Sequence, residues 1–143
     1  MDTSGCIFCR IANGQIGAAK VFEDKDVVAF LDIAPVSDGH CLVVPKGHYP
    51  TLDQCPPEAL ARIGQVAVAV ARAAIAVTGA DGYNLLCNNG RAAGQVIAHA
   101  HVHVIPRRLN DGLFDKWPSY QYPAGLIEQL AGKIRQKVKD DLD

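Results

Sequence analysis

Apolar and polar residues follow two spacings along the chain, and each spacing predicts one kind of element. Short apolar runs bounded by Gly, Pro, Asn or Asp predict strands. Tight turns between the first runs predict a mostly antiparallel sheet. Five such runs occur, at residues 19–24, 27–33, 40–45, 82–88 and 98–106.

Longer stretches with helical spacing predict the helices. Residues 56–77 open on two prolines and end just before Gly79, a common punctuation of a helix. Near the C-terminus, leucine, isoleucine and valine recur every four residues and predict a helix over 124–138. A short helix is also expected before residue 13. With the helices packed to one side of the sheet, the chain is expected to be an α+β domain.

Composition narrows the class of protein. The chain has 143 residues, enough for one domain with its own core over residues 1–143. The net charge is −1 and no basic block occurs, which argues against a large nucleic-acid-binding surface. We expect no membrane association, because the apolar run around Arg72 is too short to span a bilayer. The N-terminus has no secretory signal pattern, and the five cysteines lack framework spacing, so a reducing cytoplasm is the expected location.

Three of the five histidines fall within the short stretch HAHVHVIPR, where His99, His101 and His103 alternate with small apolar residues. Alternation is the period of a strand, so the three imidazoles are expected on one face. Three adjacent imidazoles with a purely structural role would compete for hydrogen-bond partners and repel one another once protonated. A functional site is therefore the favoured interpretation.

Two kinds of site fit this stretch. One is a catalytic zinc site with three histidine ligands, although no Asp or Glu occurs between Asp81 and Asp111 to act as its base. The other uses a neutral imidazole as a nucleophile that attacks phosphorus and forms a phosphoramidate, which water then breaks. It needs an acceptor that fixes the imidazole tautomer and donors for the phosphate oxygens. Backbone N–H groups of the glycine-containing loop before His99 are candidate donors.

The same stretch resembles the His-x-His-x-His signature of the histidine triad (HIT) superfamily of nucleotide hydrolases and transferases. Three blocks carry the resemblance, and it covers most of residues 6–107: CIFCRIANGQI, VVAFLDIAPVSDGHCLVVPKGH and NNGRAAGQVIAHAHVHVIPR. It implies a HIT-like fold, with a five-stranded antiparallel meander, helices on one side, and a homodimer that joins two sheets. The core would span about residues 5–107, with a C-terminal extension and helix over 108–143.

The resemblance also implies roles for single residues. His101 resembles the nucleophile, His103 the neighbour that contacts the phosphate, and His40 a further histidine of the network. Asp32 resembles the carboxylate that accepts hydrogen bonds from the ribose hydroxyls of a purine nucleotide. The base pocket and the ribose–phosphate contacts would be formed by Ile7, Phe8, Ile16, Phe30 and Ile33, and by Asn88, Gly94 and Gln95.

Zinc-containing members of the superfamily imply a use for the CxxC pair. Together with two histidines, the two cysteines would form a closed, structural Cys₂His₂ zinc site. Its ligands would be Cys6, Cys9, His48 and His99. Catalysis would then use histidine in place of a metal, without magnesium.

One departure concerns position 96, where many relatives have Ser or Thr and this chain has Val96. Valine cannot donate a proton, so weaker turnover of phosphoramidates is expected. His103 is retained where the nucleotidyltransferase branch has Gln, which favours hydrolysis over transfer. The expected activity is hydrolysis at the α-phosphate of purine nucleoside 5′-monophosphate derivatives, of phosphoramidate or dinucleoside polyphosphate type. A nucleotide-binding regulatory protein with little turnover and a zinc hydrolase remain as alternatives.

Overall fold

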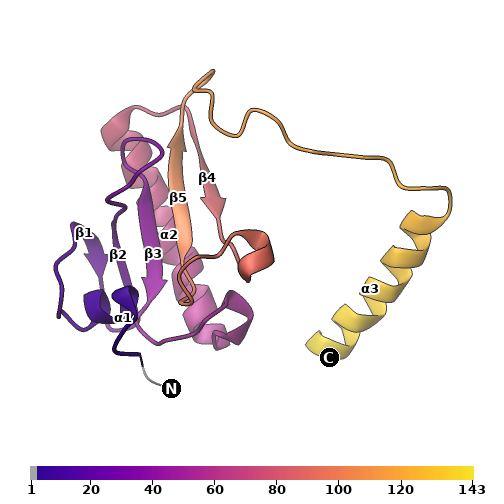
Figure 1. The fold of residues 1–143 in the computed structure, drawn as a ribbon, viewed down its shortest axis with the longest axis horizontal. Helices are drawn as coiled ribbons and strands as arrows, with labels where there is room; N and C mark the ends of the chain where they lie inside the picture. Colours follow the sequence, from indigo (N-terminus) through magenta and orange to yellow (C-terminus); the bar gives the residue numbers. More distant parts are fainter. Residues whose placement is uncertain (1–2) are drawn as a thin grey trace. The chain divides into compact units, whose positions relative to one another are not determined.

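A computed structural model describes residues 3–143. Its centre is a five-stranded antiparallel sheet with the strand order β1-β2-β3-β5-β4 (Figure 1). The α+β class expected from the sequence is therefore confirmed. The strands are β1 (Lys20–Glu23), β2 (Val27–Leu31), β3 (Cys41–Pro45), β4 (Gly82–Leu86) and β5 (Val102–Arg107).

The sheet is a meander only over its first three strands. The long helix α2 (Pro57–Thr78) follows β3 and carries the chain to β4, which lies at the edge of the sheet. β5 then returns between β3 and β4, so that Val104 pairs with Cys41 on one side and Leu85 on the other. The simple meander expected from the sequence is therefore corrected at its last two strands, because β5 finds partners on both of its edges in this position.

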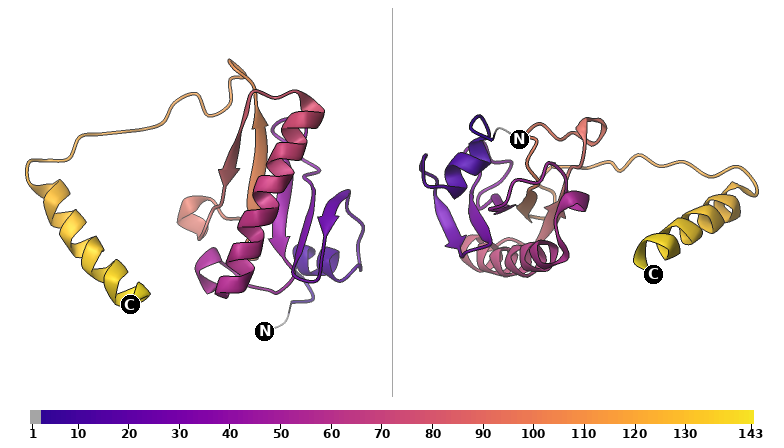
Figure 2. Two further views of the ribbon diagram at one scale, coloured as in Figure 1. Left: turned by 180° about the vertical axis from the view of Figure 1, so that it is seen from behind. Right: turned by 90° about the horizontal axis from the view of Figure 1, so that it is seen from below.

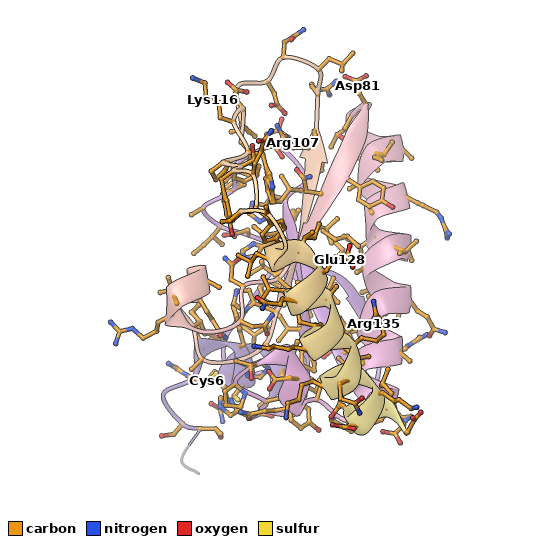
Figure 3. The ribbon with its side chains drawn as sticks, turned by 90° about the vertical axis from the view of Figure 1, so that its right-hand side faces the viewer. Cys6, Asp81, Arg107, Lys116, Glu128 and Arg135 are labelled. Carbon is orange, nitrogen blue, oxygen red and sulfur yellow. The ribbon has the colours of Figure 1, made fainter. Side chains whose placement is uncertain are left out.

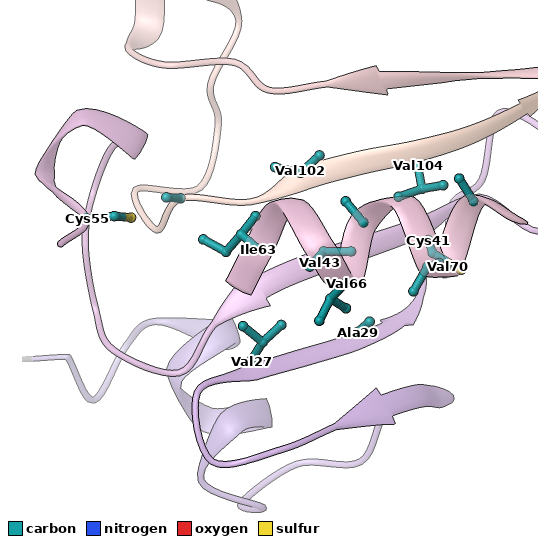
Figure 4. Close-up of a cluster of buried hydrophobic side chains, with 13 residues drawn as sticks. Val27, Ala29, Cys41, Val43, Cys55, Ile63, Val66, Val70, Val102 and Val104 are labelled. Atoms are coloured by element: carbon teal, nitrogen blue, oxygen red, sulfur yellow. The ribbon is translucent and has the colours of Figure 1, made fainter. Parts of the chain in front are cut away.

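Helix α2 covers one face of the sheet. Alternate residues of the central strands point to this face, and five residues of α2 are buried against them, which together form the larger core cluster (Figure 4). Gly79 ends the helix as expected, in the left-handed conformation at φ 71° that glycine adopts without strain. The sequence led us to expect no segment long enough to span a membrane, but α2 is long and apolar enough by length and composition alone. Its buried side nevertheless packs on the sheet.

A second, shorter helix lies on the opposite face. Helix α1 (Ile7–Ala12) packs there through Phe8 and Ile11 against Phe30, Leu42 and neighbouring strand residues (Figure 2). The Phe8 and Phe30 rings lie 5.8 Å apart between centroids. The expectation of helices on one side is therefore wrong for α1. The opposite face is also where His103 projects, because its strand partner Leu42 belongs to this cluster.

The chain divides into two compact units, Met1–Asp111 and Gly112–Asp143. The first holds the sheet, α1 and α2. The second contains α3 (Leu126–Leu142), whose charged side chains include Glu128 and Arg135 (Figure 3). Helix α3 begins two residues later and ends four residues later than the sequence pattern predicts (126 against 124, and 142 against 138).

Candidate active site and metal centre

The three clustered histidines do not share one strand. β5 begins at Val102, so only His103 lies within it, whereas His101 directly precedes it. His99 lies in a bend, and its backbone N–H donates to the Ile97 carbonyl at 2.9 Å. The expectation of three imidazoles side by side on one strand is therefore corrected: His99 and His101 both contact Phe8, but His99 groups with Cys6, Cys9 and His48, whereas His103 groups with His40 and Asp32. The His101 and His103 rings remain neighbours, with centroids 5.0 Å apart.

A backbone carbonyl fixes the tautomer of His101. Its Nδ1 lies 2.7 Å from the His99 carbonyl oxygen, which can only accept a hydrogen bond. Nδ1 therefore carries the proton, and Nε2 keeps a free lone pair. Phe8 packs against the ring with its centroid 5.0 Å away and holds the imidazole in position. The arrangement gives a buried imidazole with one ring nitrogen available.

A second chain of hydrogen bonds fixes His40 and His103. The Val36 N–H donates to His40 Nδ1 at 3.1 Å, so neutral His40 carries its proton on Nε2. That Nε2–H donates to His103 Nδ1 at 2.9 Å. His103 must then carry its own proton on Nε2. Asp32 Oδ2 lies 3.6 Å from His40 Nε2 and completes the group.

Burial keeps this pair of imidazoles neutral. It lowers the pKa of His40, and the nearby Asp32 carboxylate opposes that shift only in part. Burial also lowers the pKa of His103 to about 4, and the adjacent His101 and His40 lower it further. At neutral pH, His103 is therefore a neutral hydrogen-bond donor through Nε2.

A cavity of about 470 Å³ opens beside His101 and His103. Its other lining residues come from α1, β2, β3, the segments that follow α1 and β2, and the loop between β4 and β5. Apart from the two histidines, the expected site residues that line it are Ile7, Phe8, Ile16, Phe30, Asp32, Ile33, Asn88 and Gly94. A second cavity of about 490 Å³ runs along α2, but no histidine or carboxylate lines it among the described residues.

The side chain of Gln95 is used inside the loop. Its Oε1 accepts from the Gly90 N–H at 2.8 Å, and its Nε2 donates to the carbonyls of Pro50 at 2.6 Å and Ile97 at 2.9 Å. The structure thus gives Gln95 a loop-holding position and does not bring it to the cavity lining. Gly94 next to it has φ 90°, a conformation that favours glycine.

The cavity also contains residues that were not identified as site residues. Leu42 could have been found from strand alternation, because it pairs with His103 on the same face. Val96, which the sequence analysis noted only as a departure from the family pattern, lines the cavity and is 93% exposed, so it stands at the open side of the cavity. No local pattern marks the remaining ones, which are Ile11, Gly17, Ala18, Leu31 and Ile97.

The two cysteines of CxxC meet two histidines at the N-terminus of α1. His48 Nδ1 lies 3.2 Å from both Cys9 Sγ and His99 Nδ1. His99 Nδ1 lies 3.4 Å from Cys6 Sγ and 3.5 Å from Cys9 Sγ. All four ligand atoms lie within 4.8 Å of one another. The structure therefore brings together the four residues that the family resemblance grouped.

These distances fit a tetrahedral zinc site. Zinc bonds to sulfur and nitrogen imply ligand atoms about 3.3 to 3.8 Å apart in a tetrahedron. His99 Nε2 donates to the Pro45 carbonyl at 2.8 Å, which leaves Nδ1 unprotonated and orients it as zinc ligands usually are. Burial raises the pKa of Cys9 to about 11, with the adjacent Cys6 adding to the rise. A bound cation would favour the thiolates there.

The three clustered histidines do not fall into one candidate metal group. His99 groups with the cysteines, whereas His103 groups with His40 and Asp32.

The site combines an imidazole with one free nitrogen, a neighbouring N–H donor, a mostly apolar cavity and a separate group of candidate metal ligands, an arrangement that suits a nucleotide. The sequence profile of the HIT domain family matches residues 13–110. The chain therefore belongs to this family. An adenosine 5′-monophosphoramidase of Schizosaccharomyces pombe is 41% identical over 135 residues, covering 94% of this chain and 98% of that protein.

Two further similarities are relevant. Adenylylsulfatase HINT3 of Arabidopsis thaliana is 45% identical over 109 residues, 76% of this chain; the matched region spans 55% of that longer protein. The crystal structure of a Zn-bound histidine triad family protein from Mycobacterium smegmatis superposes with a TM-score of 0.74 at 38% identity, covering 89% of this chain and 88% of that one. The five-stranded fold is thus that of the HIT family.

Proposed function

We propose that this HIT-family enzyme hydrolyses purine nucleoside 5′-monophosphate derivatives at the α-phosphate through a covalent nucleotidyl-histidine. The observation that carries the proposal is the tautomer of His101. Its Nδ1–H is held by the His99 carbonyl, and its free Nε2 belongs to a ring that lines the cavity. Such an imidazole attacks phosphorus without first losing a proton.

The reaction then takes two balanced steps. The Nε2 lone pair of His101 forms a bond to phosphorus, and the leaving group departs with the electron pair of its own bond. The positive charge that develops on the imidazole is stabilised at Nδ1–H by the His99 carbonyl. Water next attacks phosphorus, the N–P bond breaks, and its electrons return to Nε2. The proton of the attacking water passes to the solvent or the nucleotide product.

His103 serves the phosphate in this scheme. Its Nε2–H donates to a nonbridging oxygen whose charge increases in the transition state. His40 is a positioning residue, because it holds the proton of His103 on that nitrogen. Since these neutral donors and the backbone of the loop at Gly94 receive the phosphate, we propose that the chemistry needs no magnesium.

The two ends of the cavity suit the two ends of a nucleotide. The apolar side chains from α1 and β2 form a slot for a purine base, and Asp32 lies beside them. One Asp32 oxygen accepts from the Ala34 N–H at 2.9 Å, which fixes the carboxylate to accept hydrogen bonds from ribose hydroxyls. Asn88 and Gly94 lie where the sugar and the phosphate would follow.

We also propose that zinc has a structural role here. The Cys6, Cys9, His48 and His99 cluster joins α1 to the segment that leads into the catalytic strand. A tetrahedral site with four protein ligands has no position left for a substrate. Its ion would supply only cross-linking, and the Zn-bound relative makes this the natural assignment.

Two further parts of the proposal concern assembly and location. We propose a homodimer that joins two sheets at β4, an edge strand on which Tyr83 is 41% and Leu85 44% exposed. We propose a reducing cytoplasm because the ligand thiols must stay unoxidised to hold zinc.

The test is release of nucleoside monophosphate from a small panel of AMP and GMP derivatives, with and without EDTA. The wild type should release product with or without magnesium, and His101→Gln should release none above background while it still binds AMP. Binding of AMP without any product from the wild type would instead indicate a nucleotide-binding regulatory protein. Full activity of His101→Gln would exclude the proposed nucleophile.

A further inference from the structure

We infer that Ser37 is a positioning residue for the hydrolysis, because its hydroxyl holds the turn that sets the tautomers of His40 and His103. The inference rests on the proposed function and deepens it. Ser37 lies in the 32–40 turn, which joins β2 to β3. This turn begins at Asp32 and ends at His40, so it carries two of the three residues in the group that includes His103.

One hydrogen bond of the turn reaches the sheet. The Ser37 hydroxyl donates to the Pro106 carbonyl of β5 at 2.8 Å. Other bonds stay inside the turn: the Ser37 carbonyl accepts from the His40 N–H at 3.2 Å, and the Val36 N–H donates to His40 Nδ1 at 3.1 Å. In the described part of the chain, the hydroxyl bond is the only one that residues 33–39 make to another element. Ser37 therefore ties the turn to the sheet.

The tie lies just beyond the point where the two strands stop pairing. β3 pairs with β5 only as far as Cys41 opposite Val104. Pro106 lies two residues further along β5 and close to the turn, because a Cβ added to Gly39 would come within 3.2 Å of the Pro106 ring. Val36 in the same turn is 44% exposed, so water can compete for the internal hydrogen bonds. The hydroxyl bond to Pro106 therefore opposes opening of the turn.

The closed turn selects one of two tautomer states of the neutral imidazole pair. In the first, His40 Nε2–H donates to His103 Nδ1 across 2.9 Å, and His103 keeps a proton on Nε2 for the phosphate. In the second, that proton crosses to His103 Nδ1, His40 Nδ1 gains a proton from water, and His103 Nε2 returns one. His103 Nε2 then presents a lone pair, which repels a phosphate oxygen. The Val36 N–H excludes this second state, because it would face a proton on His40 Nδ1.

Loss of the hydroxyl should therefore act through His40. When the turn opens, the Val36 N–H leaves His40 Nδ1, the second state is populated, and the transition state loses a donor. Asp32 keeps bonds of its own, because its N–H donates to the His40 carbonyl at 2.9 Å and its Oδ1 accepts from the Ala34 N–H at 2.9 Å. Binding of the ribose should change little, so the effect should fall on kcat and not on KM.

The experiment removes the hydroxyl in Ser37→Ala and keeps it in the matched control Ser37→Thr. AMP release is measured with the AMP derivative that the wild type hydrolyses fastest. Ser37→Ala should lower kcat about three- to tenfold, as expected for one hydrogen bond, and change KM by less than about twofold. Ser37→Thr should stay within about twofold of the wild type. In a His40→Phe background, Ser37→Ala should cause no further loss, because the turn acts only through His40.

Nitrogen NMR of isotopically labelled histidine reads the tautomers directly. The wild type and Ser37→Thr should carry the His103 proton on Nε2, and Ser37→Ala should add a population protonated on Nδ1. Unchanged kcat, unchanged tautomers, or an equal fall in kcat with and without His40 would each overturn the inference and leave the hydrolase proposal standing. Release of AMP from no derivative by the wild type would instead refute the proposed function, and the tautomers alone would then decide the role of Ser37.

Discussion

Removing the side-chain amide of Gln95 is expected to destabilise the fold. The amide makes three hydrogen bonds, to the backbone at Gly90, Pro50 and Ile97. Each bond contributes about 0.5 to 1.5 kcal/mol net, and the half-exposed position favours the lower part of that range. Their loss in Gln95→Met, which keeps the side-chain length, should lower the free energy of unfolding by about 2 kcal/mol.

For a chain of this size that loss corresponds to a fall in Tm of about 6 to 10 °C. Thermal unfolding followed by circular dichroism measures it, with urea unfolding as a second estimate. Gln95→Glu is the matched control: it keeps the acceptor for the Gly90 N–H but places an oxygen against two carbonyls, so it should be at least as destabilising. A Tm within about 1 °C of wild type, combined with a raised KM, would refute the reasoning and make Gln95 a substrate contact.

Three further predictions concern zinc, protonation and the relay. Chelation at neutral pH should remove zinc slowly and lower Tm, with activity lost in step with unfolding; immediate inactivation of a still-folded protein would contradict a structural ion. The pKa of His103 is lowered from 6.5 to about 4, so the unfolded chain takes up the proton first as pH falls. The free energy of unfolding that depends on neutral His103 is thus fully present above pH 6.5 and is lost as pH falls towards 4. An NMR titration of the His103 ring should show a midpoint well below 6.5. A midpoint at or above 6.5 would exclude the neutral relay. His40→Phe should lower kcat by about 10- to 100-fold with little change in KM, because His103 loses the donor that fixes its tautomer; an unchanged kcat would remove His40 from the account.

Local spacing predicted the elements of this fold better than their arrangement. Proline at the start and Gly79 at the end mark α2, and both lie where the sequence places them. The position of β5 between β3 and β4, and of α1 on the opposite face, depends on contacts between distant segments. No local pattern encodes such contacts.

The same distinction holds at the site. Alternation in the histidine stretch indicated shared chemistry, but the bend at His99 is held partly by the neighbouring Ala100 N–H, which donates to the Tyr49 carbonyl at 2.7 Å. That hydrogen bond joins residues far apart in the chain and has no signal in the sequence. The same reason applies to Gln95, which was expected to contact the ribose–phosphate. Its hydrogen-bond partners at Pro50 and Ile97 come close to it only in the folded loop.

In the proposed mechanism, His101 carries the nucleotide between the two steps. A direct test mixes the wild type rapidly with adenosine 5′-phosphosulfate and then denatures it at alkaline pH, where N–P bonds to imidazole persist. Mass spectrometry then fragments the peptide around residues 99–107 to locate the adenylyl group. Covalent catalysis by His101 should give an adenylyl group on His101 that forms before AMP and decays as AMP appears, and none on His101→Gln. An adenylyl group on His103, or turnover with no modified peptide at any time, would contradict it.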